Sequence, residues 1–268
     1  MRGGRLRAVA GEVRVEIEGQ LGWLVFDHPE RRNAISVDMW RQIPRQVAAL
    51  AADDAVRVVL LRGAGEVAFV SGADISEFEE QRTGAAAGRY EDDNVAAMRA
   101  ITQLEKPVIA MIHGFCVGGG VGISLTADLR FAASDAVFAI PAARLGLGYA
   151  PGGLETLVNL VGPSAAKEIF FTARRFDADE ALRMGLVNQV VPPGELEGVV
   201  RDTAERVAAN APLTVRSVKR IVSELRLPPA DRDTEALEQS VRVCMESEDY
   251  REGMRAFLEK RRPSFKGR

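Results

Sequence analysis

The stretch KPVIAMIHGFCVGGGVGISL, residues 106–125, decides the fold because it joins a buried strand to a helix through glycine. Residues 107–114 form a short continuous apolar run, which is typical of a strand covered on both faces. Three glycines at 118–120 follow and open a helical pattern. Glycine lets a backbone approach a ligand closely, but the stretch has neither the Lys-Ser/Thr of a P-loop nor a GxGxxG fingerprint. It predicts a strand-to-helix turn with accessible backbone.

The same alternation of strands and helices continues on both sides of this stretch. Apolar runs at 56–63 and 128–133 predict two further strands, and a helical pattern at 92–104 lies between the first of them and residue 107. Strands that alternate with helices indicate βαβ units and a right-handed, largely parallel sheet. The sequence therefore predicts an α/β fold.

The N-terminal part predicts a hairpin followed by a helix. Residues 13–18 alternate apolar and charged side chains, and an apolar segment at 21–27 follows after a Gly-Gln break. Ser36 fits the N-cap of a helix whose apolar positions have helical spacing, although Pro44 lies inside that pattern. The small-residue segment 82–88 predicts a mobile loop.

Near residue 195 the pattern changes from mixed α/β to helical. We therefore predict two parts, a core domain over 1–195 and a helical C-terminal region over 196–268. The predicted helices of the second part cover 196–209, 212–226, 231–247 and 249–260.

Composition excludes several classes of protein. The 268 residues carry a net charge of −3, which argues against nucleic acid as the main partner. No apolar run reaches the roughly 20 residues of a membrane span, and the N-terminus lacks the apolar region of a secretory signal. The two cysteines and two histidines form no metal-spaced set. We expect a reduced, cytoplasmic protein without a metal site.

A second segment, FVSGADISEF at 69–78, also places glycine between a strand end and a predicted helix. Backbone N–H groups at such a turn have no intrahelical partner and can point at an anion. The simpler interpretation is a tight turn. Together with residues 118–120, however, the segment offers one N–H donor from each of two turns. That is the anatomy of an oxyanion hole, which stabilises charge developing on a carbonyl oxygen.

Several segments, in this order, make the chain resemble the crotonase (enoyl-CoA hydratase/isomerase) superfamily from about residue 13 to the C-terminus. The segments are HPERRNAIS (28–36), FVSGADISEF (69–78), KPVIAMIHGFCVGGG (106–120), DLRFAASDAVFAIP (128–141), the LGLG…GG segment (145–153), FTARRFDADEALRMGLVNQVV (171–191) and EGMRAFLEKRRPSF (252–265). The resemblance implies a spiral of ββα turns with a helical C-terminal trimerisation region, assembled as trimers or dimers of trimers.

The resemblance also implies a substrate and its binding residues. The substrate is an acyl-CoA thioester, whose oxygen two peptide N–H groups hold; carried over by motif, these belong to Ala73 and Gly119. Ala73 is also placed at the CoA site. Arg31 is a plausible contact for CoA phosphates, and Phe265 and Lys266 for the nucleotide end of CoA across a subunit contact. The family needs no metal or redox cofactor, since coenzyme A is part of the substrate.

Two positions depart from the pattern of the hydratases in this superfamily. Those enzymes use two glutamates, and this chain has Gly122 and Ala142 in their places. Hydration requires one group that activates water and one that delivers a proton to the α-carbon. Neither glycine nor alanine can do either, so we expect a reaction other than hydration unless another carboxylate enters the pocket.

Within the superfamily the chain is most similar to methylmalonyl-CoA decarboxylase-like members, through SEDYREGMRAFLEKRRPSF at 247–265. Decarboxylation of a malonyl-type thioester needs the oxyanion hole but no base that removes a carbon-bound proton. Tyr149 falls where that enzyme has a tyrosine that contacts the substrate carboxylate, although a packed aromatic is an equal alternative. The decarboxylase carries His at the position of Ala73 and keeps Glu at the position of Gly122.

Two further interpretations stay open. One is an enoyl-CoA hydratase or isomerase with a relocated acid/base, for which Glu155 near a predicted helix start is the first candidate. The other is a non-catalytic acyl-CoA-binding protein.

Other polar residues have simpler structural interpretations. We expect Asp74 to cap a helix, His113 to be a hydrogen-bonded structural histidine, and the glutamates at 77, 79 and 80 to form a solvated helix face. For Phe265 and Lys266, a frayed tail is the alternative to CoA binding.

Overall fold

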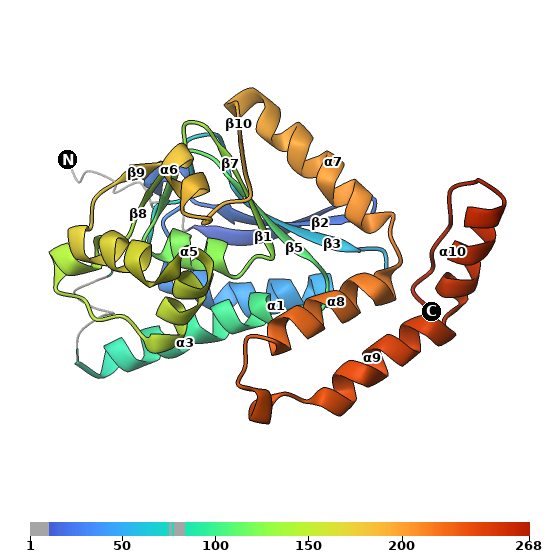
Figure 1. The fold of residues 1–268 in the computed structure, drawn as a ribbon. Helices are drawn as coiled ribbons and strands as arrows, with labels where there is room; N and C mark the ends of the chain where they lie inside the picture. The colour runs from blue at the N-terminus through green and yellow to red at the C-terminus, as the bar shows by residue number, and fades with distance from the viewer. Residues whose placement is uncertain (1–10, 75–76, 78–83) are drawn as a thin grey trace.

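The fold centres on a twisted sheet covered by helices on both faces (Figure 1). The computed structural model describes residues 11–74, 77 and 84–268. Within them the main sheet has the strand order β1-β2-β3-β5-β7-β10. Its strands are β1 (Glu12–Glu18), β2 (Leu21–Asp27), β3 (Val58–Gly63), β5 (Val108–Ile112), β7 (Leu129–Ala133) and β10 (Gln189–Val191). The predicted hairpin is the antiparallel pair β1–β2, and the other pairs are parallel, which confirms the largely parallel sheet.

A second, smaller sheet carries the glycine-rich segments, and the sequence did not predict it as separate. Among the described residues its order is β4-β6-β8-β9, from β4 (Ala68–Val70), β6 (Phe115–Val117), β8 (Val137–Ala139) and β9 (Phe176–Asp177). The apolar run at 107–114 thus contains β5 of the main sheet, and β6 of the small sheet follows it directly. The division between the two sheets lies at Gly114, where a Cβ would overlap the carbonyl oxygen of Val67.

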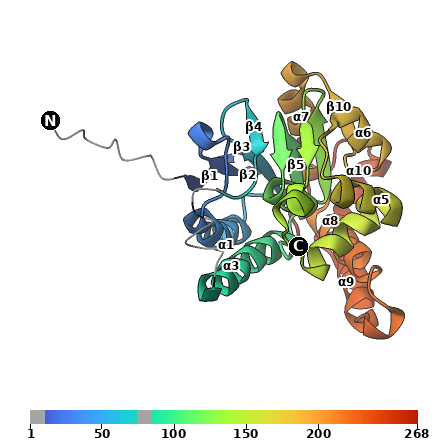
Figure 2. The same cartoon turned by 90° about the vertical axis from the view of Figure 1, so that its left-hand side faces the viewer.

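Two helices lie on one face of the main sheet, and their buried side chains form the larger hydrophobic core together with side chains of the strands. The helix α1 (Val37–Ala52) begins where predicted, since the Ser36 hydroxyl accepts the Met39 N–H, and it continues through Pro44. The helix α3 (Gly84–Thr102) packs beside α1 (Figure 2). The loop predicted over 82–88 is therefore wrong for residues 84–88, because three alanines favour helix over the flanking glycines. Residues 82 and 83 lie outside the described residues.

The opposite face of the main sheet is covered by α7 (Leu196–Ala208). Its buried side chains Leu196, Val200, Ala204 and Ala208 join a second core with residues of β2, β3 and β5. The boundary at 195 stays a prediction, with α7 lying beyond it and packed on the sheet.

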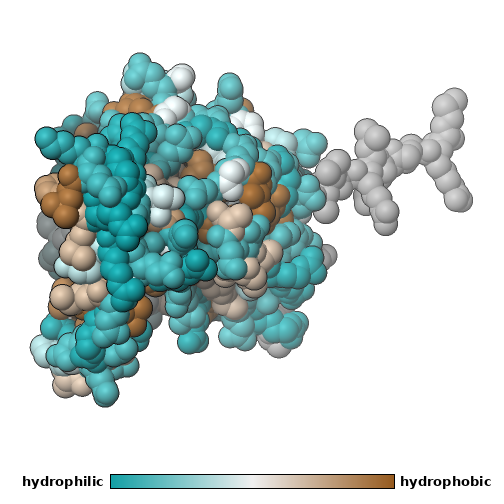
Figure 3. All heavy atoms as spheres, turned by 90° about the vertical axis from the view of Figure 1, so that its right-hand side faces the viewer, coloured by the Kyte–Doolittle hydropathy of each residue, from teal (hydrophilic) through white to brown (hydrophobic). Residues whose placement is uncertain are grey.

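The remaining C-terminal helices confirm the helical pattern predicted after residue 196. They are α8 (Pro212–Glu224), α9 (Thr234–Glu246) and α10 (Glu248–Leu258), and α9 and α10 extend away from the sheets (Figure 1). Several of their large apolar side chains are exposed, including Met245, Met254 and Phe257. Figure 3 faces this side and shows apolar patches between hydrophilic side chains.

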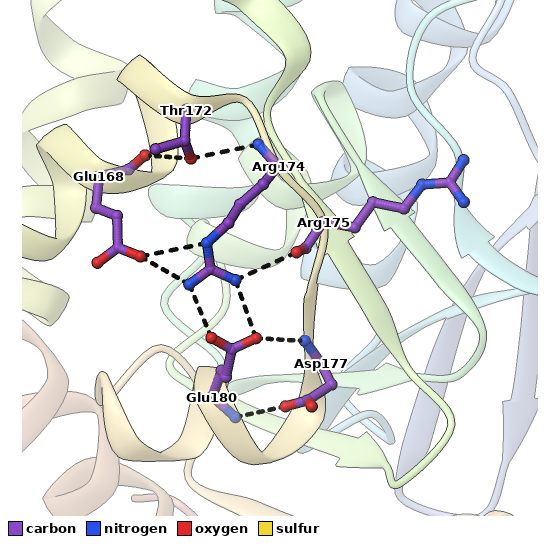
Figure 4. A network of polar contacts seen from close by, with 6 residues as sticks. All are labelled: Glu168, Thr172, Arg174, Arg175, Asp177 and Glu180. Carbon is purple, nitrogen blue, oxygen red and sulfur yellow. Dashed lines mark hydrogen bonds and ion pairs between the residues drawn. The ribbon is translucent and has the colours of Figure 1, made fainter.

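One polar network joins α5 (Pro151–Thr172), a helix whose start the sequence analysis expected near Glu155, to α6 (Ala178–Arg183), which it did not predict (Figure 4). The Arg174 guanidinium lies between Glu168 of α5 and Glu180 of α6, with N–O distances of 2.7 Å to each. The hydrogen bond from Arg174 is the main cause of the lowered pKa of Glu180. Glu180 also completes a capping box with Asp177 at the start of α6. The network therefore fixes the connection between α5 and the small sheet.

Candidate active site

The two glycine-containing turns lie side by side at the ends of β4 and β6. Gly72 has φ +111° and Gly118 has φ +54°, values that favour glycine. A Cβ at Gly118 would lie 3.9 Å from the Gly72 Cα, and one at Gly119 would lie 3.9 Å from the Ala73 nitrogen. The structure thus brings together the two residues that the motif comparison selected.

The hydrogen bonds around Ala73 direct its N–H toward this gap. Ile35 forms a bridge with Ala73, in which the Ile35 N–H donates to Gly72 O and the Asp74 N–H donates to Ile35 O. Because successive amides of an extended chain point to opposite sides, the Ala73 N–H points away from Ile35. Within the described part of the chain, no backbone hydrogen bond uses it as a donor. This N–H faces the gap between the two turns, on the side where Gly119 lies.

The second donor belongs to the first residue of α4 (Gly119–Leu125). The N–H of the first helical residue has no intrahelical acceptor, and the positive end of the helix dipole adds to its attraction for an anion. Gly120 packs directly on β4, since a Cβ there would overlap the Val70 carbonyl oxygen. This close approach sets the position of Gly119 relative to the strand that leads to Ala73.

A pair of aromatic side chains lies next to the Gly119 donor. A Cβ at Gly119 would lie 3.5 Å from Cζ2 of the Trp40 ring. The Trp40 indole Nε1 donates a hydrogen bond of 3.0 Å to the hydroxyl of Tyr90, which is buried on α3. The sequence analysis singled out neither residue for the site. Trp40 is one of the apolar positions with helical spacing after Ser36, and that spacing indicates a buried residue but not a role in a site.

Neither position of the missing glutamates holds an ionisable group. Gly122 lies on α4 one turn after Gly119, and a Cβ there would come within 3.0 Å of Cε of Met98. Ala142 is buried in a short 3-10 helix over Pro141–Leu145. The structure therefore shows no acid/base at these two positions.

The two other residues predicted as catalytic lie near the N-terminal end of α5: Tyr149 just before the N-cap residue, and Glu155 after the first turn. The Tyr149 ring is half-buried and makes an edge-to-face contact with Phe170, with centroids 4.8 Å apart. Glu155 is exposed and lies beyond the first turn of α5, which contains no acidic residue. Because α5 already begins at Pro151, the carboxylate of Glu155 does not lie at the helix N-terminus, where an acid would interact favourably with the helix dipole.

The residues predicted to bind CoA lie in two places. Arg31 is exposed, and its carbonyl oxygen accepts the Ser71 hydroxyl at 3.1 Å, so it adjoins the strand end that leads to Ala73. The Phe265 ring lies 3.5 Å from where a Cβ of Gly253 on α10 would be, and the Lys266 N–H donates to the Asp249 carboxylate at 2.6 Å. These contacts contradict a frayed tail.

The tail and the oxyanion donors lie at opposite ends of α1. Lys266 lines a cleft of about 670 Å³ together with Val47, Ala51 and other residues from the second half of α1. Ala73 instead pairs with Ile35, just before α1 begins. A helix of this length spans roughly 24 Å, so one chain does not bring Lys266 to Ala73.

Three further expectations concerned polar residues near the turns. Glu77 is half-buried and accepts the Val37 N–H at 2.8 Å, so its expected place on a solvated face is wrong; residues 79 and 80 lie outside the described residues. Asp74 is buried, and its carbonyl oxygen accepts the Glu77 N–H. The histidine His113 is buried, with its Nε2 atom unpartnered among the described residues, and burial lowers its pKa.

No group of three or more potential metal ligands occurs within the described ranges. Those ranges also contain no helix that is both long and apolar enough to cross a membrane.

Comparison with known proteins identifies the family. Residues 16–268 match the family described as enoyl-CoA hydratase/isomerase. The short-chain-enoyl-CoA hydratase of Clostridium acetobutylicum is 38% identical over 96% of this chain and 98% of its own length. The crotonyl-CoA hydratase of Syntrophomonas wolfei is 38% identical over 94% and 96%. The structure of an enoyl-CoA hydratase/carnithine racemase from Magnetospirillum magneticum has a TM-score of 0.91 at 35% identity, covering 96% of both chains. The chain therefore belongs to the enoyl-CoA hydratase/isomerase family and has the α/β fold of the crotonase superfamily with a helical C-terminal region.

Proposed function

We propose that this chain transforms an acyl-CoA thioester whose carbonyl oxygen binds between the N–H groups of Ala73 and Gly119. The observation that carries the proposal is the 3.9 Å separation between the Ala73 nitrogen and the Cβ position of Gly119. Two N–H donors on packed turns stabilise the negative charge of an enolate more than that of the ground-state thioester. Such a site promotes reactions that pass through a thioester enolate.

The names of the relatives favour hydration or isomerisation of a short-chain enoyl-CoA. Two relatives at 38% identity are named as hydratases of short-chain enoyl-CoA or crotonyl-CoA. Hydration needs a group that activates water and a group that protonates the α-carbon. With Gly122 and Ala142 unable to serve, the acid/base is relocated in this proposal, and Glu155 and Tyr149 at the start of α5 are its candidates.

Decarboxylation of a short malonyl-type thioester is the second candidate, favoured by the two positions that lack a carboxylate. The bond between the α-carbon and the carboxylate breaks, its electron pair forms the enolate, and carbon dioxide leaves. The α-carbon then takes a proton from solvent. Tyr149 would contact the substrate carboxylate. In this proposal the chain acts as a methylmalonyl-CoA decarboxylase-like member of the superfamily.

The remaining features of the proposal concern binding, assembly and location. Arg31 would pair with CoA phosphates, because guanidinium groups bind phosphate with two hydrogen bonds. Phe265 and Lys266 would approach the nucleotide end of CoA held by a neighbouring subunit. We propose a homotrimer or a dimer of trimers in the cytoplasm, with no metal or redox cofactor.

Turnover of crotonyl-CoA, methylmalonyl-CoA and ethylmalonyl-CoA by the purified protein, followed by mass spectrometry, separates these reactions. Hydration of crotonyl-CoA supports the first candidate, and loss of carbon dioxide without hydration supports the second. Gly119→Pro removes the donor N–H and should abolish either reaction while circular dichroism shows the fold intact. If the variant keeps its activity, the oxyanion role of Gly119 is wrong. If the wild-type protein binds these thioesters but turns over none, it is a non-catalytic binder.

A further inference from the structure

The face of α4 beside the oxyanion hole carries two glycines that lie one turn apart. Gly119 and Gly122 are partly accessible, while the residues between and after them, Gly120, Val121, Ile123 and Ser124, are buried. Residues three apart lie on the same face of a helix. Gly122 therefore faces the same space as the Gly119 N–H, about 4.5 Å further along the helix axis.

A methionine from another helix occupies the position next to Gly122. The Cε atom of Met98, on α3, lies 3.0 Å from where a Cβ of residue 122 would be. That distance is shorter than ordinary van der Waals contacts, so a side chain at 122 would require Met98 to move. Met98 is half-buried and packs against the larger core. Its terminal methyl group occupies the position that a side chain at residue 122 would need.

The surface beside the two glycines is mainly apolar. Trp40 contacts the position of a Gly119 side chain, and its indole N–H is satisfied by the Tyr90 hydroxyl. Tyr90 and Met98 both come from α3. An acyl chain that extends from a thioester oxygen at Gly119 toward Gly122 would meet a ring and a thioether.

We propose that Met98 determines which acyl groups the site accepts, by filling the space beside Gly122 and so limiting the substrate to a short chain with a branch no larger than a methyl group. The inference rests on the proposed binding of the thioester oxygen at Ala73 and Gly119. Methionine suits this role because its flexible, polarisable side chain packs against apolar groups of irregular shape.

Calorimetric binding of three saturated thioesters tests this inference without any turnover. The probes are butyryl-CoA, isobutyryl-CoA and 2-ethylbutyryl-CoA, measured with wild type, Met98→Ala and the volume-conserving control Met98→Leu. Wild type and the leucine variant should prefer the first two. The alanine variant should improve the affinity for 2-ethylbutyryl-CoA relative to butyryl-CoA by about tenfold, as two newly buried carbons allow.

Equal affinity ratios in wild type and Met98→Ala would overturn the role of Met98 while leaving the proposed function intact. If the wild-type protein binds none of the three thioesters, both the inference and the proposed function fail. Should Met98→Ala not fold, Met98→Val creates a smaller space for the same measurement. The relative affinity for 2-ethylbutyryl-CoA must then still rise, or the inference is wrong.

Discussion

The guanidinium of Arg130 donates a 2.6 Å hydrogen bond to the carbonyl oxygen of Ala127, tying the first residues of β7 to the turn that follows α4. The same buried side chain reaches the carbonyls of Ser124 and Leu186. Burial lowers the pKa of Arg130 to about 10, and the charge of Asp128 only partly opposes this shift. A cation near the C-terminal end of a helix is favourable for the helix dipole. Arg130 thus holds one end of the helix whose other end supplies the Gly119 donor.

Replacement of Arg130 by Met should lower the free energy of unfolding by about 3 kcal/mol, because it leaves buried carbonyl oxygens without donors. Urea denaturation of the purified variant measures this loss. The matched control is Arg206→Met on α7, where the side chain is 76% exposed; its effect should stay within about 0.5 kcal/mol. Similar losses for the two variants would show that the carbonyl contacts of Arg130 add no stability.

Replacement by alanine should affect stability very differently at two neighbouring glycines of α4. At Gly120 a methyl group would overlap the Val70 carbonyl oxygen, whereas at Gly119 it would meet Trp40 at an ordinary 3.5 Å. Gly120→Ala should therefore lower the free energy of unfolding by about 3 kcal/mol. Gly119→Ala should leave it nearly unchanged. Thermal unfolding of the pair provides the comparison, and equal melting temperatures would contradict the close approach of α4 to β4.

His113 should make stability depend on pH just below neutrality. Burial is the main cause of its lowered pKa, with Asp135, Glu66 and Arg62 as the charged groups that act on it. The unfolded chain then binds a proton that the folded chain resists, so stability falls as pH drops below about 6.5. Wild type should lose more free energy of unfolding between pH 7.5 and 5.5 than His113→Gln. Parallel losses in the two proteins would refute this contribution.

A glutamate introduced at position 122 should increase the rate of hydration only when Met98 is replaced by a smaller residue. In Gly122→Glu alone, the new side chain competes with the Cε atom of Met98 for the same space. The double variant Gly122→Glu/Met98→Ala gives the carboxylate room beside the oxyanion hole, and a positioned general acid/base is worth about a hundredfold in rate. Hydration of crotonyl-CoA is the assay. If the single and double variants hydrate equally fast, Met98 does not restrict residue 122.

Much of the main sheet could be predicted from the sequence because its strands carry long, uniform patterns. The alternating residues 13–18 and the apolar runs at 56–63 and 128–133 all became strands. The small sheet escaped because its strands have two or three residues each, too few to show a period. Its separation from the main sheet also depends on Gly114, whose contact with Val67 is invisible in one sequence.

The candidate site likewise has one part that the sequence could predict and one part that it could not. Its two turns could be predicted because glycine at a strand-to-helix turn is a local signal, and the resemblance to the crotonase superfamily assigned the donors to Ala73 and Gly119. Trp40, Tyr90 and Met98 could not be assigned to it, since each looks like an ordinary apolar position of an amphipathic helix. Only three contacts in the folded chain place them beside the donors: Trp40 with Gly119, Met98 with Gly122, and Tyr90 with Trp40.

The contact of Gly120 with the carbonyl of Val70 has a consequence for how the family can diversify. It fixes the spacing of the two donors through main-chain packing, with no side chain as an intermediary. The residue proposed to limit the acyl group, Met98, belongs to another helix, α3. Under the proposed function, a substitution at position 98 therefore changes substrate preference and leaves the spacing of the two donors unaltered.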